Sequence, residues 1–231
     1  MNLDNKEYYM LRLALLSILV LGTFGIVLQA DESEAYNWDR DQPHAEAEAA
    51  QPPPLGTALA QDLLLTNQEG DAVHLHEAVQ GSATLLVIYR GGWCPFCTTQ
   101  LAGLGEVRDS LLEYGVDIIG ISPDGPEALK ESGVTHELAY TLLGDSQGKV
   151  IRRLGLIFTL DEETVERYQE MGLPLATDEW GNTVMPVPAV LLIDETGVIR
   201  WTFHDANFRE RPDVDVVLEA VVELTQDGDS E

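Results

Sequence analysis

Two cysteines separated by two residues constrain this chain more than any other feature. They lie in the stretch Arg-Gly-Gly-Trp-Cys-Pro-Phe-Cys, residues 90–97, and no other cysteine occurs in the sequence. The stretch follows a run of apolar and β-branched residues, 83–89, which is typical of a buried strand. It precedes residues 98–114, whose apolar side chains recur at helical spacing. The pair is therefore predicted to lie where a central strand ends and a helix begins.

This position favours redox chemistry of the two thiols. A helix N-terminus carries partial positive charge and unpaired N–H groups, which stabilise a thiolate, and the thiolate is the nucleophile of thiol–disulfide exchange. Two other interpretations remain open. A structural disulfide would restrict little of the unfolded chain, because the bridged residues are so close. A zinc site needs about four ligands, whereas the sequence has no second cysteine pair and no His-x-x-x-His motif.

Charge excludes some classes of partner. The chain of 231 residues carries 40 acidic and 13 basic residues, a formal net charge of −27. This charge argues against binding to nucleic acid or to anionic lipid surfaces. The length fits one domain with extensions or two small domains, and a hydrophobic content of 45% is enough for a sizeable core.

Near the N-terminus, residues 11–28 form a nearly unbroken apolar segment. Lys6 and Arg12 lie at or before its start and acidic residues follow it, which predicts a cytoplasmic N-terminus and export of the rest. We expect an uncleaved signal anchor rather than a cleaved signal peptide. Either one would place the protein in the cell envelope, periplasmic or on the extracytoplasmic face of the inner membrane, with this segment as its contact with the membrane.

The composition divides the chain into four parts. Residues 1–30 are predicted to be the signal anchor or signal peptide, and residues 31–54 an acidic, proline-rich linker that forms no core. Residues 55–226 are the predicted folded domain, and residues 227–231 a polar tail.

Apolar strands and amphipathic helices alternate through the predicted domain. This rhythm favours an α/β sheet with parallel members. Strands are predicted at residues 63–65, 73–75, 116–122, 140–143, 189–194 and 198–203, and helical segments at 127–132, 150–154, 162–171 and 212–224.

Three stretches resemble a known family. They are residues 89–97 with the Trp-Cys-Pro-Phe-Cys motif, residues 155–160 (Gly-Leu-Ile-Phe-Thr-Leu), and residues 186–194 with 197–200. In these motifs the chain resembles peroxiredoxin-like proteins of the alkyl hydroperoxide reductase/thiol-specific antioxidant (redoxin) family, over about residues 55–224. The resemblance implies a thioredoxin-like fold, with a central mixed sheet flanked by helices, and an antioxidant redox role. No cofactor is expected.

The family's Pro-x-x-x-Thr-x-x-Cys site is only partly matched. Its peroxidatic cysteine falls on Cys97, its threonine on Cys94 and its proline on Arg90. The arginine that activates peroxide in the family falls on Pro188. What remains resembles a thioredoxin-type pair, in which the first cysteine attacks and the second resolves.

These departures favour an exported thiol–disulfide oxidoreductase, with Cys94 as the attacking thiolate and Cys97 as the resolving thiol. Its expected partners are protein or small-molecule thiols and disulfides, with an upstream thiol as electron donor. The alternative is a thiol-dependent peroxidase that reduces hydroperoxides, with the two cysteine roles reversed. A metal chaperone using the cysteines and a histidine such as His204 ranks below both, and no metal ligand is assigned.

Six further residues are expected to support the pair. Trp93, Pro95 and Phe96 belong to the motif, and the two aromatic residues would offer an apolar surface to a substrate. Arg90 would either lower a thiol pKa or, as we prefer, pair with an acid at the strand end. The resemblance further implies a cis bond between Val187 and Pro188, with Pro188 against the disulfide.

Overall fold

The computed structural model describes residues 44–228. The predicted signal segment, residues 1–30, and the linker as far as residue 43 lie outside this range, as do the last three residues of the tail. Within residues 44–228, no helix is both long enough and apolar enough to cross a membrane.

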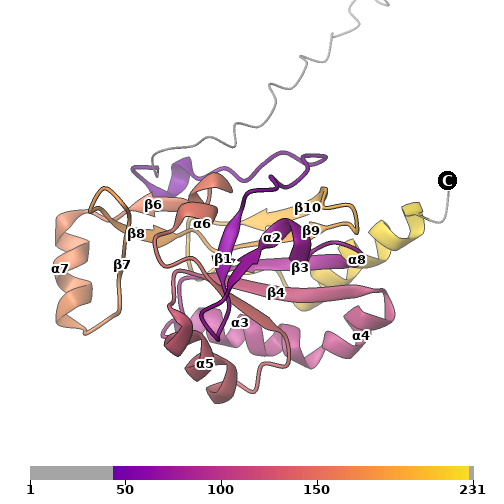
Figure 1. The fold of residues 1–231 in the computed structure, drawn as a ribbon, viewed down its shortest axis with the longest axis horizontal. Coiled ribbons are helices and arrows are strands. Elements are labelled where there is room, and N and C mark those ends of the chain that lie inside the picture. Colours follow the sequence, from indigo (N-terminus) through magenta and orange to yellow (C-terminus); the bar gives the residue numbers. More distant parts are fainter. Residues whose placement is uncertain (1–43, 229–231) are drawn as a thin grey trace, which may run out of the picture. The chain divides into compact units, whose positions relative to one another are not determined.

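A seven-stranded mixed sheet forms the centre of the fold, in the order β10-β9-β3-β4-β5-β1-β2 (Figure 1). Strands β3, β4 and β5 run parallel, whereas β9 and β1 pair antiparallel with β3 and β5. The strands are β1 (Leu64–Thr66), β2 (Ala72–His74), β3 (Ala83–Ile88), β4 (Val116–Ser122), β5 (Thr141–Gly144), β9 (Ala189–Ile193) and β10 (Ile199–His204). This arrangement confirms the predicted α/β sheet with parallel members.

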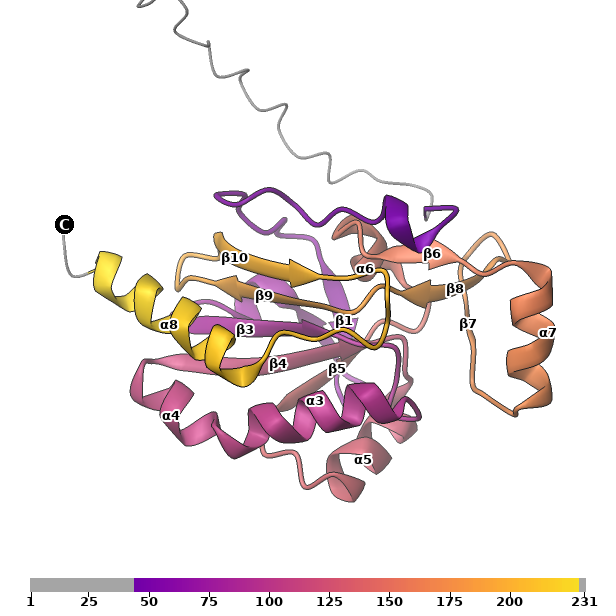
Figure 2. The ribbon, with the colours of Figure 1, turned by 180° about the vertical axis from the view of Figure 1, so that it is seen from behind.

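Strand β3 is buried along its whole length and apolar except for Thr84, because both faces of the sheet are covered. Leu85 and Val87 face a core shared with helices α3 (Pro95–Glu106), α4 (Arg108–Glu113), α5 (Pro126–Thr135) and α8 (Val214–Gly228). Leu86 and Ile88 face a second core, shared with α2 (Leu75–Ala78) and α6 (Lys149–Arg153). Figure 2 shows α3 and α8 on the same side of the sheet.

The helix predicted at residues 98–114 forms as two helices. It begins earlier, at Pro95, and is interrupted at Val107, which ends α3 and precedes α4. Proline suits the first position of a helix because its ring fixes a helical φ and the N–H that it lacks would be unpaired there. The strand–helix junction at the cysteines is confirmed.

Residues 44–54, which the sequence assigns to the linker, lie along the domain. The His44 N–H donates to the Ile157 carbonyl at 3.1 Å, and the Gln51 N–H donates to the Gly155 carbonyl at 3.0 Å. Ala50 is buried in the second core, and a short 3₁₀ helix, η1 (Ala47–Ala49), precedes it. The ordered chain therefore begins before the predicted boundary at residue 55.

Residues 155–186 form a second, three-stranded sheet that the sequence did not predict. Its order is β6-β8-β7, and it consists of β6 (Ile157–Thr159), β7 (Ala176–Thr177) and β8 (Thr183–Pro186). Such short strands carry too few residues for a period of two to be recognised. Helix α7 (Glu162–Glu170) was predicted, and the Asp161 carboxylate caps it by accepting a bond of 2.8 Å from the Thr164 N–H. Helix α7 stands apart from the central sheet (Figure 1 and Figure 2).

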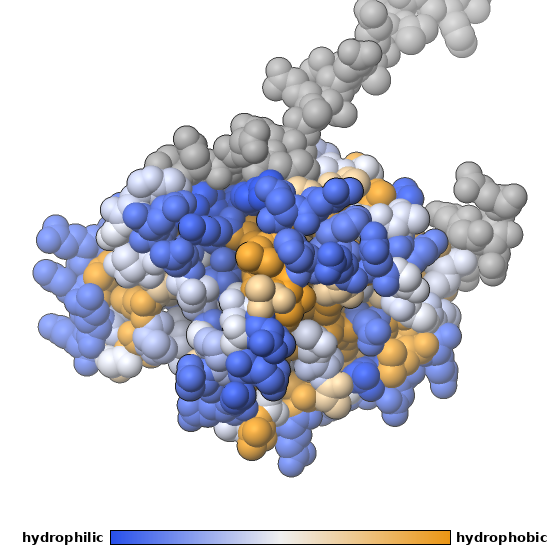
Figure 3. All heavy atoms as spheres, viewed as in Figure 1, coloured by the Kyte–Doolittle hydropathy of each residue, from blue (hydrophilic) through white to orange (hydrophobic). Residues whose placement is uncertain are grey.

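The surface matches the strongly charged composition. Hydrophilic residues cover most of the face seen in Figure 3, with apolar residues gathered near its middle.

The central position of β3 makes it the strand most sensitive to truncation. We expect Leu86→Ala to lower the free energy of unfolding by about 2–5 kcal/mol, because this fully buried side chain would leave a cavity. The matched control is Leu64→Ala on β1, where the side chain is 50% exposed and a loss of no more than about 1 kcal/mol is expected. Chemical denaturation measures both, and equal losses would contradict the assignment of β3 as the centre of the core.

Candidate active site

The two cysteines occupy the first turn of α3. Cys94 is the residue that caps the helix, and its carbonyl accepts the Cys97 N–H and the Thr98 N–H, each at 3.0 Å. Both cysteines are free thiols. Cys94 is 1% exposed and Cys97 is fully buried. The prediction that Cys94 lies at an exposed edge is therefore wrong.

The loop between β10 and α8 supplies a residue that the sequence reasoning missed. Arg211 extends from this loop, and its Nη2 donates to the Cys97 Sγ at 3.5 Å. Its Nη1 is fixed by the Phe208 carbonyl at 2.8 Å and by the Glu210 carbonyl. The loop thus brings a guanidinium directly onto the thiol pair.

The two thiols differ in acidity. A hydrogen bond from the Cys97 thiol lowers the pKa of Cys94 to about 6, and the positive charges of Arg90 and Arg211 act in the same direction. The interaction with Cys94 and burial together raise the pKa of Cys97. The site therefore favours one thiolate, on Cys94, beside one protonated thiol.

Arg90 is buried and interacts with aromatic rings instead of the predicted acid. Its guanidinium carbon lies 4.2 Å from the centre of the Phe208 ring and 5.1 Å from that of Trp93. It also donates to the Tyr168 hydroxyl, on α7, at 3.1 Å. The preferred interpretation, pairing with an acid at the strand end, is wrong, because no carboxylate of residues 44–228 forms an ion pair with Arg90. The other interpretation, a lowered thiol pKa, agrees with the effect of Arg90 on Cys94.

Asp124 holds the loop that precedes the cysteines. Its Oδ2 accepts the Gly92 N–H and the Ser122 hydroxyl, both at 2.9 Å, and burial raises its pKa. A side chain on residue 92 would collide with the Ser132 hydroxyl. Gly91 has a φ of +143°, which disfavours any other residue. The sequence placed Asp124 only in a turn, because its contact with the cysteine loop is not local.

The aromatic residues of the motif flank the two cysteines in the chain and differ in exposure. Phe96 is 40% exposed and packs edge-to-face against Phe208, with ring centres 5.7 Å apart. Trp93 is partly buried against the core that contains both cysteines. Pro95 begins the helix, so it positions the pair through the backbone.

The bond between Val187 and Pro188 is trans, so the predicted cis bond is wrong. Strand β8 ends at Pro186 and β9 begins at Ala189, so Val187 and Pro188 are the two residues that join the second sheet to the central one. Both residues line a pocket of about 210 Å³ that Arg90, Tyr168 and Phe208 also line. This pocket lies beside the thiol pair.

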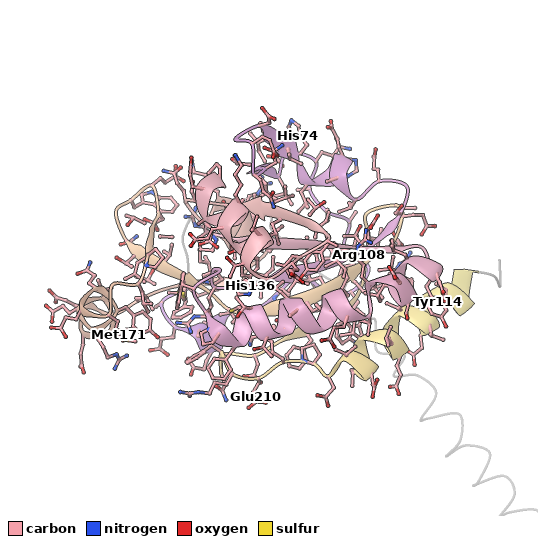
Figure 4. All side chains as sticks on the ribbon, turned by 90° about the horizontal axis from the view of Figure 1, so that it is seen from below. His74, Arg108, Tyr114, His136, Met171 and Glu210 are labelled. Atoms are coloured by element: carbon pink, nitrogen blue, oxygen red, sulfur yellow. The ribbon has the colours of Figure 1, made fainter. Side chains whose placement is uncertain are left out.

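Two further observations concern the described structure outside this site. A pocket of about 1170 Å³ is lined by Tyr114, among others, at the end of the domain opposite α7 and Met171 (Figure 4). Across residues 44–228, no three His, Cys, Asp or Glu side chains gather as a ligand set for a metal ion.

Comparison with known proteins identifies relatives of this chain. The sequence profile described as the AhpC/TSA family matches residues 57–202. Peroxiredoxin Bcp of Escherichia coli (strain K12) is 36% identical over 98 residues, which are 42% of this chain and 62% of the relative. The chloroplastic peroxiredoxin Q of Gentiana triflora is 32% identical over 92 residues, 40% of this chain and 42% of the relative. The chain therefore spans less than two thirds of these relatives.

Solved structures show the same fold. Peroxidoxin BcpB from Mycobacterium tuberculosis has a TM-score of 0.58 and 18% identity, and the match covers 74% of this chain and 96% of that one. A cysteine-to-serine mutant of the peroxiredoxin 6 of Arenicola marina has a TM-score of 0.61 and 16% identity, covering 76% and 74%. The reduced Prx3 from Vibrio vulnificus, in complex with H₂O₂, has a TM-score of 0.59 and 18% identity, covering 73% and 98%. These matches confirm the predicted thioredoxin-like α/β fold.

Replacing Cys97 tests the origin of the acidic thiol. In the unaltered protein, thiolate absorbance near 240 nm is expected to rise with a midpoint near pH 6. In Cys97→Ala, which removes the donor that contributes most, the midpoint moves upward toward the ordinary thiol value of about 8.5. Arg209→Gln is the control, because Arg209 stacks on Phe96 and Phe208 and makes no hydrogen bond to either sulfur. A midpoint that stays near pH 6 in Cys97→Ala would contradict this origin.

Proposed function

Because the chain belongs to the AhpC/TSA family, we propose that it is a thiol-dependent peroxidase whose redox couple is Cys94 and Cys97. Peroxidase activity is the alternative that the sequence alone ranked second, but that alternative assigned the attack on peroxide to Cys97, whereas the present proposal keeps Cys94 as the attacking thiolate. The observation that carries the proposal is the contact between the Arg211 guanidinium and the Cys97 sulfur.

Arg211 answers the main argument against peroxidase activity. The family's activating arginine falls on Pro188, which has no charge, so the sequence alone indicated that the polarising group was missing. Arg211 comes from another element, the loop before α8, and brings a cation to the thiol pair. Arg211 contacts Cys97, and its positive charge also lowers the pKa of Cys94, the proposed attacking thiol. A fixed cation near the reacting sulfur stabilises the charge that develops as an O–O bond breaks.

Burial of the pair also favours a small oxidant. With Cys94 at 1% exposure and Cys97 fully buried, a disulfide of a folded protein cannot meet either sulfur without displacing the surrounding loops. A hydroperoxide group has only two oxygen atoms, so it can reach a buried sulfur through a narrow opening. The exposure of the thiols therefore favours hydroperoxides over protein disulfides as the oxidising substrate.

The proposed chemistry begins with the thiolate of Cys94. It attacks the terminal oxygen of R–O–O–H, an S–O bond forms, the O–O bond breaks, and the departing RO⁻ takes up a proton to give an alcohol, or water when R is hydrogen. Cys94 is left as a sulfenic acid. The Cys97 thiol then attacks the Cys94 sulfur, the S–O bond breaks, and water leaves as the disulfide forms.

An external thiol donor completes the cycle. Two thiols give two electrons and two protons to the Cys94–Cys97 disulfide, by thiol–disulfide exchange, and are themselves joined as a disulfide. The exchange chemistry expected from the sequence thus becomes the second half of a peroxidase cycle.

We also propose that residues 11–28 anchor the protein in the membrane and place the domain outside the cytoplasm. The proposal rests on the apolar run and on the charge asymmetry around it. Carbonate extraction of membranes from cells that express the full chain tests it, because an anchored protein stays in the pellet and a protein released with the soluble fraction would overturn it.

Single cysteine variants test the proposed roles. Cys94→Ser is expected to abolish hydrogen peroxide turnover, because it removes the attacking thiolate. Cys97→Ser is expected to react once with peroxide and then stop, leaving a sulfenic acid on Cys94 that dimedone labels and mass spectrometry locates. Arg209→Gln is the matched control and should turn over.

Two outcomes of this test would contradict the proposal. A rapid dimedone adduct on Cys97 in Cys94→Ser would reverse the two roles, as the family alignment suggests. Turnover of a disulfide substrate without turnover of any hydroperoxide would replace the peroxidase with a disulfide oxidoreductase.

A further inference from the structure

The pocket beside the thiol pair is lined by two chemically different kinds of side chain. Apolar residues line it, among them Phe158, Leu160 and Val187. Two arginines, Arg90 and Arg167, line it as well. A ligand that fits both kinds of side chain has an apolar body and an anionic group.

Positive charge is concentrated here in a protein that is otherwise strongly acidic. Three of its 13 basic residues, Arg90, Arg167 and Arg211, lie at the pocket or the thiol pair. None of the three forms an ion pair with a carboxylate of residues 44–228, where the ion pairs involve other cations. Local positive charge in a concave site attracts anions even when the net charge is negative.

One carboxylate does line the pocket. Asp161 accepts bonds from the N–H and the hydroxyl of Thr164, at 2.8 and 2.9 Å, and these bonds, with the charge of Arg167, lower its pKa. Its acceptor oxygens are thus engaged in capping α7. Two guanidinium groups against one carboxylate leave the pocket with a net positive charge.

The pocket is connected to the reacting sulfurs by two of its own lining residues. The Arg90 backbone N–H is hydrogen-bonded to Cys97. The Phe208 carbonyl accepts the bond that positions Arg211 against Cys97. A molecule bound in the pocket is therefore separated from Cys97 by one residue, Arg90, on the first route and by two, Phe208 and Arg211, on the second.

From these observations we infer that the pocket binds the organic part of a hydroperoxide that carries a carboxylate. The apolar lining residues contact the hydrocarbon, and Arg167 with Arg90 binds the carboxylate. The volume of about 210 Å³ lies below the roughly 300–1,000 Å³ of pockets for drug-sized ligands, so the organic part is small, such as one substituted aromatic ring. That the ligand is a hydroperoxide rests on the proposed peroxidase function.

Binding of an unreactive analogue tests the pocket without any turnover. By isothermal titration calorimetry, 4-isopropylbenzoate is expected to bind the reduced protein more tightly than the uncharged 4-isopropylbenzamide. Arg167→Gln is expected to weaken benzoate binding about tenfold, as for the loss of one charge-assisted hydrogen bond, and Arg167→Lys to restore part of it. Arg200→Gln is the matched control, because it removes one positive charge at the opposite end of the domain. Equal binding of the two analogues, or equal effects of Arg167→Gln and Arg200→Gln, would overturn the inference.

Turnover then tests the substrate class. The substrate is the hydroperoxide that has the carbon skeleton of 4-isopropylbenzoate and keeps its carboxylate. Its kcat/KM is divided by the kcat/KM for hydrogen peroxide, and this ratio is the measured quantity. This ratio is expected to fall about tenfold in Arg167→Gln and to stay constant in Arg200→Gln. A ratio unchanged in Arg167→Gln would overturn the inference while leaving the peroxidase function in place. Benzoate binding without turnover of any hydroperoxide would overturn the proposed function and, with it, the assignment of the ligand as a hydroperoxide.

Discussion

Positive charge near the thiols, which no carboxylate of residues 44–228 neutralises in an ion pair, is the constraint on which this site depends. Arg90 is 5% exposed and Arg211 lies against Cys97, yet neither forms an ion pair with a carboxylate of residues 44–228. A buried charge without a partner is costly. Aromatic rings and the Tyr168 hydroxyl offset part of the cost for Arg90. The thiolate of Cys94 supplies the negative charge, so the acidity of this thiol and the stability of the arginines are coupled.

The fold brings these groups together from three segments that are far apart in the sequence. The junction between β3 and α3 supplies Arg90 and the cysteines, α7 supplies Tyr168, and the loop before α8 supplies Arg211. The junction follows the central sheet, where β3 is paired on both sides and buried on both faces. Tyr168 accepts a hydrogen bond from Arg90, and Arg211 donates to the Phe208 and Glu210 carbonyls and to Cys97. The electrostatic environment of the pair therefore depends on two segments outside the central sheet.

The sequence predicted those parts of the structure that local patterns determine. Strand β4 forms over Val116–Ser122 as predicted, and the cysteines lie at the junction of β3 and α3. Contacts between segments far apart in the sequence were not predictable from one chain. Arg211 is 114 residues from Cys97 and Tyr168 is 78 residues from Arg90, and no periodicity connects them. The burial of Cys94 was missed for the same reason, because distant segments meet around the pair.

The attachment of residues 44–54 has a mechanical consequence. His44 is joined to β6 by two backbone hydrogen bonds, one to the Ile157 carbonyl and one from the Thr159 N–H, at 3.1 and 2.8 Å. Phe158 lies between Ile157 and Thr159 in the strand, and it is one of the apolar residues that line the pocket. A force applied to the chain before residue 44 is therefore borne first by β6, ahead of the central sheet. Tension on this segment and the width of the pocket are linked through a single strand of three residues.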